Sequence, residues 1–461
     1  MVAALAGIFV FLRLAVAWKV LLAFIVMSQC FDLLPPIVYG REVWDLGAVM
    51  LLTAAVQLMF ARPKEPKVRA FSITLLWVFF IWLLFCLVYS LFVYGYPVLN
   101  TLKVSRQMVI GYLSIFVFLR LFRVDKNALQ TFIKWLYIIT YILLFVAIVQ
   151  YVIGTPILGG LSVEYLGAVR YLPVFLPISL FYMWVIFSKY FSERIKFHEW
   201  IYGAMVFIVV ATTYTRGIYI AVIVSFLAML FLLILHGRLK ATSGIIFVFL
   251  MTAGLTILVS GGWMDRVIVR AGSGLDLVLD QKDRGAKENI DTFHGRLLLV
   301  EERIALVSER NPIVGFGFLH ENDVPNSMRS RFRYGSIVAT PEMMERYADG
   351  QPYVLALYSV DIGWANIVLN TGFVGSFLFI SFVVAFLLSY KKLKHSTPPL
   401  SHYRIAFFVQ TIALLILMFN GNPFTGNVQI VAFMIAGYFY TTAKLRLEAR
   451  QLAGSNFSKG R

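Results

Sequence analysis

Long apolar segments follow one another along most of this chain, and they limit what it can fold into. The chain has 461 residues, of which 60% are hydrophobic and only 14% are charged. Soluble domains average about 45–50% apolar and about 25% charged residues. A helix needs about 20 apolar residues to cross the hydrocarbon core of a membrane. Because no globular core would bury so many runs of this length, the sequence predicts an all-α polytopic membrane protein.

About twelve segments are long and apolar enough to be candidate transmembrane helices. They are residues 14–35, 43–61, 70–93, 107–122, 128–153, 171–190, 200–214, 217–236, 243–260, 363–390, 405–420 and 427–443. This pattern divides the chain into four parts. They are a bundle of nine spans over residues 1–260, a large loop with short helices over 261–362, three further spans over 363–443 and a basic tail over 444–461.

Positive charge separates the loops between these segments into two alternating sets. The basic set contains Arg62, Lys64, Lys67, Arg69, Arg120, Arg123, Lys126, Lys189, Arg194, Lys196, Arg238, Lys240, Lys391, Lys392, Lys394 and Arg404. The other short loops contain only Arg41, Lys103, Arg106 and Arg170. By the positive-inside rule, we expect the basic loops and both termini in the cytoplasm, with the tail against anionic lipid headgroups. The net charge of +17 then follows from topology, and no nucleic-acid partner is indicated.

The segment 261–362 is the one long polar insertion, and the parity of the spans places it outside the cytoplasm. Residues 261–352 carry twelve Lys and Arg against fourteen Asp and Glu, so this part is nearly neutral. A loop of this length inside a compact protein is usually functional. Over the whole chain the six histidines show no metal-ligand spacing, and Cys30 and Cys86 lie in apolar runs. The sequence therefore predicts no metal, no cofactor and no disulfide framework.

Arg216 lies in the turn between the seventh and eighth predicted spans, flanked by Thr215 and Gly217. An arginine near the hydrocarbon edge is costly unless it reaches the headgroups, pairs with an acid or meets an anionic ligand. Gly217 permits a close backbone approach, and the Thr215 hydroxyl supplies a further donor. Two interpretations stay open: a contact with an anionic substrate, or an interfacial arginine that simply reaches water.

An amphipathic helix is predicted from Gly295 to Arg310 in the large loop. Arg296, Arg303 and Arg310 are seven residues apart and share one face, and we expect the leucines and the isoleucine on the other face. A positive side chain in the first turn opposes the helix dipole, which favours an anion contact for Arg296. For Arg303 and Arg310 a solvated face with acidic neighbours (Glu302, Glu309) is the simpler interpretation, although Arg303 remains a candidate substrate contact.

The helix is followed by Asn311-Pro312-Ile313-Val314-Gly315-Phe316-Gly317-Phe318. Proline ends the helix, and Gly315 and Gly317 permit a tight backbone path that would let substrate approach. Phe316 and Phe318, like Tyr334 and Trp364, would stack on sugar rings, but core packing is the simpler interpretation for each. Arg329, Arg331 and Arg333 would gather an acidic glycan, or form a solvated face.

A second polar group precedes the tenth predicted span. It consists of Tyr358, Asp361, Trp364 and Asn366, within the run Tyr358-Ser359-Val360-Asp361-Ile362-Gly363-Trp364. Partial desolvation would raise the pKa of Asp361 toward that of a useful general base. An N-cap at the start of the helix is the alternative role for Asp361. Tyr358, Trp364 and Asn366 are candidate sugar contacts, and Thr371-Gly372-Phe373-Val374-Gly375 follows one turn later.

These elements, in this order, resemble the O-antigen ligase and Wzy-type polysaccharide polymerase superfamily, membrane glycosyltransferases of the GT-C class. The shared pattern is a Thr-Arg-Gly turn, a large loop with Gly-Arg-Leu and Asn-Pro-Ile-Val-Gly-Phe-Gly-Phe, and Asp-Ile-Gly-Trp before the next span. It covers roughly residues 205–390. The resemblance implies a bacterial inner-membrane enzyme whose active site faces the periplasm and uses glycans carried on undecaprenyl pyrophosphate.

The resemblance also implies roles for individual residues. Arg216 and Arg296 would hold the pyrophosphate without a metal, since guanidinium pairs bidentately with phosphate oxygens, and Asp361 would orient or deprotonate the acceptor. The expected activity is polymerisation of lipid-linked repeat units with inversion, and a chain-length regulator protein is a possible partner. Ligases of the superfamily, which transfer glycan to lipid A–core, usually carry a histidine-asparagine pair where this chain has Asp361 and Ile362, which favours the polymerase.

A transporter of the lipid-linked glycan is a third hypothesis, from a different class of protein. Twelve spans with both termini in the cytoplasm would fit such a transporter or flippase. Such transporters are usually built from two similar halves. No repeat relates residues 1–230 to 231–461, and a 100-residue outer loop is unusual for that class.

Overall fold

A computed structural model describes most of the chain, except for the segment between residues 237 and 292 and several shorter gaps. The described residues are 9–35, 37–38, 41–65, 68, 70–155, 157–158, 162–165, 168–190, 193–213, 215–237, 292–325, 328, 331–332, 357–358, 362–391, 398–419, 421–425 and 427–459. The predicted span 243–260, most of the predicted loop 261–362 and Asp361 lie outside the described residues.

Helices account for most of the described residues. They are α2 (Val16–Met27), α3 (Gln29–Asp32), α4 (Val43–Phe60), α5 (Phe71–Phe92), α6 (Val98–Val124), α7 (Ala128–Ile153), α8 (Leu176–Tyr190), α9 (Phe197–Thr212), α10 (Arg216–Leu235), α13 (Thr292–Arg310), α16 (Gly363–Leu388), α17 (Pro398–Leu417) and α18 (Val428–Lys459), with a 3-10 turn at Glu321–Asp323. In the described part of the chain, eight helices are long and apolar enough to cross a membrane. The protein is therefore a polytopic membrane protein, as its apolar segments predict.

Two of the other apolar segments are shorter in the structure than in the prediction, and a third is shifted. The first ends as α2 at Met27, and α9, with 16 residues, begins at Phe197, three residues before the predicted segment 200–214. The predicted span 171–190 starts later, at Leu176, because residues 168–171 form a strand. The total of about twelve spans in the whole chain stays a prediction. Two short antiparallel hairpins, β1 (Ile37–Val38) with β2 (Arg41–Glu42) and β3 (Ser162–Tyr165) with β4 (Ala168–Tyr171), were not predicted.

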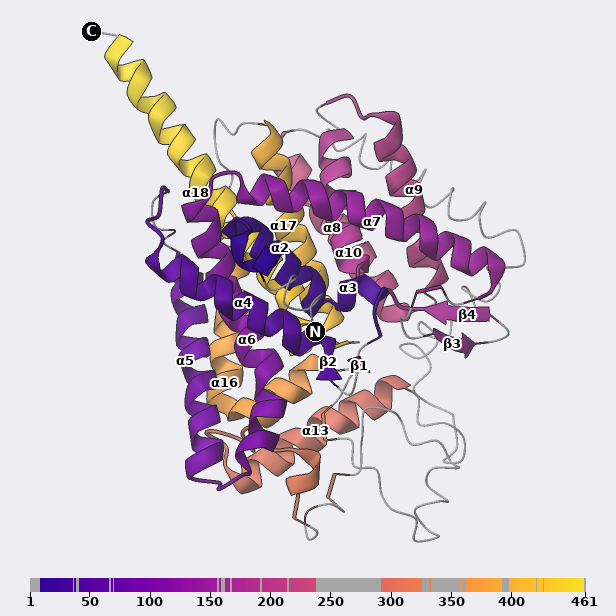
Figure 1. Cartoon of the computed structure of the whole chain (residues 1–461), viewed down its shortest axis with the longest axis vertical. Coiled ribbons are helices and arrows are strands. Elements are labelled where there is room, and N and C mark those ends of the chain that lie inside the picture. The colour runs from indigo at the N-terminus through magenta and orange to yellow at the C-terminus, as the bar shows by residue number, and fades with distance from the viewer. Residues whose placement is uncertain are drawn as a thin grey trace.

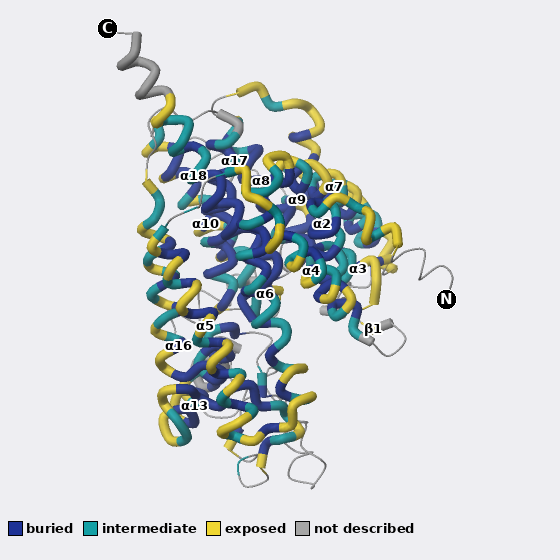
Figure 2. The backbone as a smooth tube through the Cα atoms, turned by 60° about the vertical axis from the view of Figure 1, so that its left-hand side comes forward, coloured by how far each residue is buried: buried dark blue, intermediate teal, exposed yellow. Residues whose placement is uncertain are grey.

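The helices pack around α18, whose residues from Ile430 to Tyr440 are almost completely buried. α18 lies against α6 and α17, α17 also packs on α8 and α10, α16 on α5, and α2 on α4. Figure 2 shows the buried stretches concentrated where α17, α18 and α10 run together, and exposed stretches along α5 and α16. α13 lies across one end of the bundle, and the C-terminal part of α18 projects from the opposite end (Figure 1).

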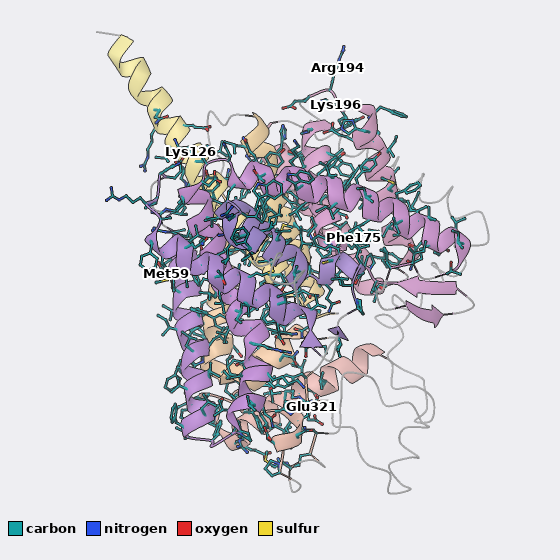
Figure 3. The ribbon with its side chains drawn as sticks, viewed as in Figure 1. Met59, Lys126, Phe175, Arg194, Lys196 and Glu321 are labelled. Carbon is teal, nitrogen blue, oxygen red and sulfur yellow. The ribbon has the colours of Figure 1, made fainter. Side chains whose placement is uncertain are left out.

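Basic loops gather at the end from which α18 projects. Lys126, Arg194 and Lys196 lie there, whereas Glu321 lies at the α13 end (Figure 3). We call these the basic end and the α13 end. Arg120 of α6 donates to Leu58 O at 3.1 Å and Ala61 O at 2.7 Å, which are unpaired carbonyls at the end of α4. A cation at a helix C-terminus also complements the helix dipole.

Residues Gln29 to Asp32 form a left-handed turn directly after α2. Four consecutive non-glycine residues have positive φ there, between 49° and 71°. Each such residue costs about 1–2 kcal/mol, so surrounding contacts must hold the turn. Two contacts do so: Phe31 is completely buried in the core, and the buried Asp32 carboxylate accepts a hydrogen bond from Val174 N at 2.9 Å, just before α8.

Candidate functional site

The loop after α13 is inserted into a break in α16. At Gly372 the backbone leaves the helical conformation, with φ 63° and ψ −165°. In a continuous helix Phe373 N would donate to Leu369 O, four residues earlier. Instead Leu369 O accepts from Phe316 N at 2.8 Å, and Phe373 N donates to Pro312 O at 2.8 Å. The loop therefore satisfies the backbone groups that the break exposes.

Glycines make this insertion possible. A Cβ on Gly372 would lie 2.3 Å from Ile313 O, and a Cβ on Gly315, where φ is +72°, would lie 2.5 Å from Leu369 O. A Cβ on Gly317 would lie 2.2 Å from the hydroxyl of Ser90, which accepts from Phe318 N at 2.9 Å. Gly315 and Gly317 are thus required for contact with the chain's own backbone and side chains. Their predicted role in binding substrate stays a prediction.

α13 turns its arginine-bearing face inward, so one part of the sequence prediction is wrong. Leu299, Arg303 and Leu306 are all buried, whereas Ile304 is 41% exposed. Leu299 and Leu306 lie on the same face as Arg303 and Arg310, because these four positions are spaced three or four apart. α13 packs against α16, so this shared face points toward the bundle.

Arg303 is buried among polar and aromatic partners rather than solvated. Its guanidinium is 1% exposed, pairs with Glu302 and donates to Leu357 O at 3.2 Å. It also lies 4.8 Å from the ring centroid of Phe332. A buried charge persists only where it is paired and hydrogen-bonded. The solvated interpretation is therefore wrong for Arg303, while its predicted contact with substrate stays a prediction.

Arg310 closes the other end of α13 against a tyrosine pair that the sequence interpretation missed. Its guanidinium donates to Tyr96 Oη at 3.0 Å and lies 4.8 Å from the ring of Tyr94 and 5.0 Å from that of Phe316. Tyr94 Oη donates to Gly315 O at 2.6 Å. Burial raises the pKa of Tyr96 to about 12 despite the nearby Arg310, so the phenol is neutral near pH 7. The predicted acidic neighbour, Glu309, pairs with Arg331 instead.

The backbones that carry Arg216 and Arg296 approach the same part of the molecule. α10 begins at Arg216 and packs against α17. His236, at the other end of α10, lies 3.4 Å from Tyr390 Oη, and the Tyr390 ring contacts Arg404, which is near the start of α17. The two helices are therefore antiparallel. Since both helices have 20 residues, α10 begins beside the end of α17. The side chains of Arg216 and Arg296 lie outside the described residues.

The end of α17 joins this region to α16 and α13. Gly363 N donates to Met418 O at 3.1 Å and to Gly421 O at 3.0 Å, and Ile362 pairs with Gly421. Leu299 of α13 packs with Ile362 and Ala365. The end of α17 thereby connects three places, which are the start of α10, the first turns of α13 and Ile362, the residue after Asp361. Asp361 itself lies outside the described residues.

The remaining predicted contacts are mostly engaged with the protein. Thr215 is buried and its hydroxyl donates to Thr213 O at 2.9 Å, and Gly217 is half-buried as the second residue of α10. Tyr358 Oη donates to Leu319 O at 2.7 Å, and burial raises the pKa of this phenol well above its ordinary value. Asn366 is buried, with its Nδ2 3.5 Å from Thr425 Oγ1.

The aromatic residues of the loop pack into the core. Phe316 and Phe318 are fully buried, which confirms the simpler interpretation of these two rings. Trp364 is half-buried, with its ring 5.4 Å from Phe379 and 5.8 Å from Phe419. Its indole N–H has no hydrogen-bond acceptor among the described residues. Tyr334 lies outside them.

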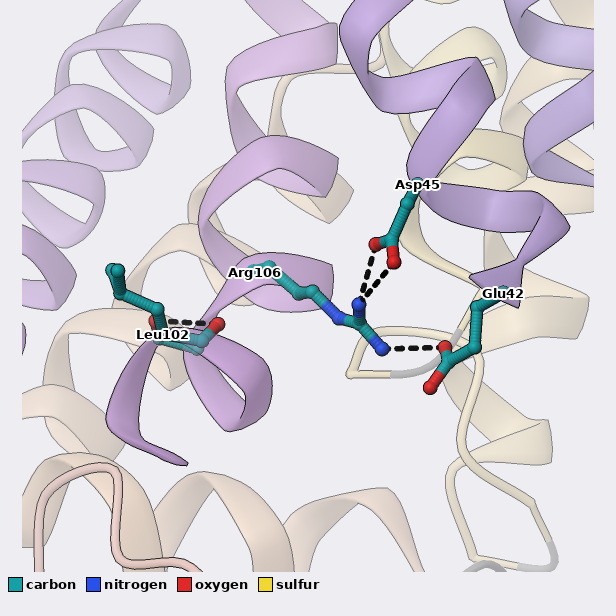
Figure 4. Close-up of polar contacts among 5 residues, drawn as sticks. Glu42, Asp45, Leu102 and Arg106 are labelled. Atoms are coloured by element: carbon teal, nitrogen blue, oxygen red, sulfur yellow. Dashed lines mark hydrogen bonds and ion pairs between the residues drawn. The ribbon is translucent and has the colours of Figure 1, made fainter. Parts of the chain in front are cut away.

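A second polar cluster, unrelated to the predicted site, lies between α4 and α6. Arg106 donates from one nitrogen to both carboxylate oxygens of Asp45, at 2.5 and 2.6 Å, and pairs with Glu42 at 2.5 Å (Figure 4). Its Cζ is 5.9 Å from the ring of Trp44. The cluster borders a cleft of about 430 Å³. In the sequence, Arg106 and Lys103 are two of the few charges in the outer loops, and nothing there indicates this cluster.

The chain matches no protein-family model and no curated protein. No group of three or more His, Cys, Asp or Glu side chains able to hold a metal ion occurs in the described part of the chain. The function must therefore be argued from the residues themselves.

Proposed function

We propose that this protein is a membrane glycosyltransferase that joins oligosaccharide repeat units carried on undecaprenyl pyrophosphate, at the periplasmic face of the bacterial inner membrane. The observation that carries the proposal is the inward arginine face of α13. Arg303 is buried on the face that packs toward α16, and position 296 lies seven residues, about two turns, earlier, so the helical period predicts Arg296 on the same face. Leu299 on that face packs with Ile362, next to Gly363, which is hydrogen-bonded to the end of α17. The helix α10 begins with Arg216 beside that end.

Chemistry at such a site needs two cations and one acceptor of a proton. In the proposed reaction, an acceptor sugar hydroxyl attacks the anomeric carbon of the donor glycan. The bond from that carbon to the pyrophosphate oxygen breaks, and the electron pair leaves with the undecaprenyl pyrophosphate. Arg216 and Arg296 stabilise the growing charge, and the hydroxyl proton passes to Asp361. A single displacement inverts the configuration at the anomeric carbon.

Electrostatics near the start of α10 support an anion there. α8 and α10 both run antiparallel to α17: Ser188 Oγ of α8 lies 2.7 Å from His402 Nδ1, and Trp184 Nε1 donates to Gln410 at 2.9 Å. Both helices therefore begin near the same end of the bundle. A helix N-terminus carries a partial positive charge and unpaired N–H groups, which favour phosphate.

A transporter of the same lipid-linked glycan is the third hypothesis, and a broken helix such as α16 is the feature that would suggest it. Broken helices line the substrate sites of many transporters, where unwound backbone groups are free to bind the cargo. Here Leu369 O and Phe373 N at the break are already occupied by the 312–316 loop. This occupation favours a fixed structural joint over a binding site, and hence the enzyme over the transporter.

A product assay separates the hypotheses. Purified protein in liposomes is supplied with undecaprenyl-pyrophosphate-linked repeat units and, in a parallel reaction, with lipid A–core. Longer glycans on the carrier would support the polymerase. Transfer to lipid A–core would support the ligase instead, and movement of unchanged substrate across the bilayer would support the transporter.

A further inference from the structure

The cleft between α5 and α6 combines an apolar wall with a charged cluster at its mouth. It is lined by Leu99, Leu102, Lys103, Ser105, Arg106, Val109 and Ile110 of α6 and by Leu87 of α5. Residues 99, 102, 103, 106 and 110 fall on one stripe of the helix. α6 runs from Val98 to Val124, and its apolar part, 107–122, is the segment expected to cross the membrane. Because Arg106 directly precedes this part, the cluster is expected at the depth of lipid headgroups, with Val109, Ile110 and Leu87 toward the hydrocarbon.

The cationic groups of this cluster retain donors for another ligand. Arg106 uses its two terminal nitrogens on Asp45 and Glu42, but its Nε–H is buried and has no acceptor among the described residues. Lys103 is exposed and pairs with none of the acidic side chains that the structure describes. Phosphate oxygens are the acceptors that arginine and lysine bind best.

The acidic groups are also incompletely used. The side chains of Glu42 and Asp45 are 33% and 41% exposed, so each keeps oxygen lone pairs for a further donor. Two cations and two carboxylates leave the cluster with no net charge. A purely anionic headgroup would gain from Lys103 and Arg106 but would be repelled by Glu42 and Asp45. A headgroup that carries both a phosphate and an ammonium complements all four.

We propose that this cleft binds a zwitterionic phospholipid with a primary ammonium, phosphatidylethanolamine. Lys103 Nζ and Arg106 Nε donate to the phosphate, and the ammonium donates to Glu42 and Asp45. One acyl chain lies along Leu87, Val109 and Ile110. The lipid satisfies the Arg106 donor that has no acceptor in the described part of the chain, and it secures the mouth of the cleft where α4 meets α6. This assignment is independent of the proposed enzymatic activity.

Native mass spectrometry of the purified full chain tests the proposal. Phosphatidylethanolamine, phosphatidylglycerol and phosphatidylcholine with identical acyl chains are titrated separately. Phosphatidylethanolamine should bind about tenfold more tightly than either of the others, since loss of one charge-assisted hydrogen bond is worth about this factor. Equal binding of phosphatidylglycerol, or of phosphatidylcholine, whose ammonium has no hydrogen to donate, would overturn the proposal.

Two variants locate the site and exclude a general loss of fold. Lys103→Gln should weaken phosphatidylethanolamine binding about tenfold, while Lys134→Gln, at an exposed position of α7, should leave it unchanged. Asp45→Asn removes one negative charge, so it should shift the preference toward phosphatidylglycerol. Unchanged binding in Lys103→Gln, or an unchanged preference in Asp45→Asn, would refute the assignment.

Discussion

Arg216 and Arg296 are the residues on which the proposed chemistry depends. Arg216→Ala and Arg296→Ala should each abolish polymer formation while the protein still inserts, because charge on the departing pyrophosphate is then uncompensated. Lysine at either position should restore activity only in part, since it lacks the planar fork of guanidinium. Glycan length on the lipid carrier is the measurement, with Lys134→Ala as the control. Polymer of normal length from either alanine variant would remove that arginine from the mechanism.

Only glycine fits at position 372, where α16 is broken. Gly372→Ala should lower stability by about 1–3 kcal/mol, because the φ of 63° is unfavourable for alanine and its Cβ would lie 2.3 Å from Ile313 O. Gly203→Ala is the matched control, since a Cβ there meets nothing within 4 Å and alanine favours the helix. Thermal unfolding in detergent reports both. Equal midpoints for the two variants would show that the break tolerates a side chain.

Sequence patterns predicted the burial and partners of single residues less well where these depend on contacts with residues far away in the sequence. The spacing of Arg303 and Arg310 correctly placed both on one face of a helix, and for Arg296 this stays a prediction. The same spacing places Leu299 and Leu306 on that face too, which the sequence prediction overlooked. Burial of Arg303 depends on Leu357 O, 54 residues away, and no local pattern contains that contact. The partners of Arg106 are similarly distant, since Asp45 lies 61 residues earlier.

At the scale of elements, apolar length predicted the starts of most long helices, but α6 and α17 begin nine and seven residues before their predicted starts. α4, α5, α7 and α16 begin within one residue of their predicted starts, because each apolar run is bounded by polar or turn-forming residues. The break within α16 was not predicted. It depends on hydrogen bonds from the 312–316 loop, so the apolar run on both sides of Gly372 gives no indication of it. The two hairpins were missed because their strands have only two or four residues.

The junction between α4 and α6 illustrates how one side chain joins two elements. Arg120→Gln should lower stability by about 1.5–3 kcal/mol, since Leu58 O and Ala61 O then lose a charged hydrogen-bond donor. Arg62→Gln, at a nearby exposed arginine, should change stability little. The midpoint of thermal unfolding distinguishes them. If both variants unfold at the wild-type temperature, Arg120 does not cap α4.

At the scale of the whole molecule, the separation of a basic end from the α13 end predicts orientation. In a background with Cys30→Ala and Cys86→Ala, a cysteine replacing the exposed Asn322 should react with a membrane-impermeant thiol reagent in cells with a permeable outer membrane. A cysteine replacing the exposed Lys126 should react only after the inner membrane is opened, because basic loops stay in the cytoplasm. The reverse pattern of labelling would invert the proposed topology and place α13 in the cytoplasm.

The central claim is that the start of α10 and the first turns of α13 bring two guanidinium groups to one diphosphate. Cross-linking tests it most directly. In the same cysteine-free background, Arg216→Cys and Arg296→Cys are combined and treated with a bifunctional maleimide about as long as two arginine side chains. An engineered protease site within residues 262–290 allows the linked fragments to be identified. The account predicts efficient linkage of this pair and none between Lys134→Cys and Arg296→Cys, which also lie on opposite sides of the cleavage site. Fragments that separate completely after cleavage would contradict it.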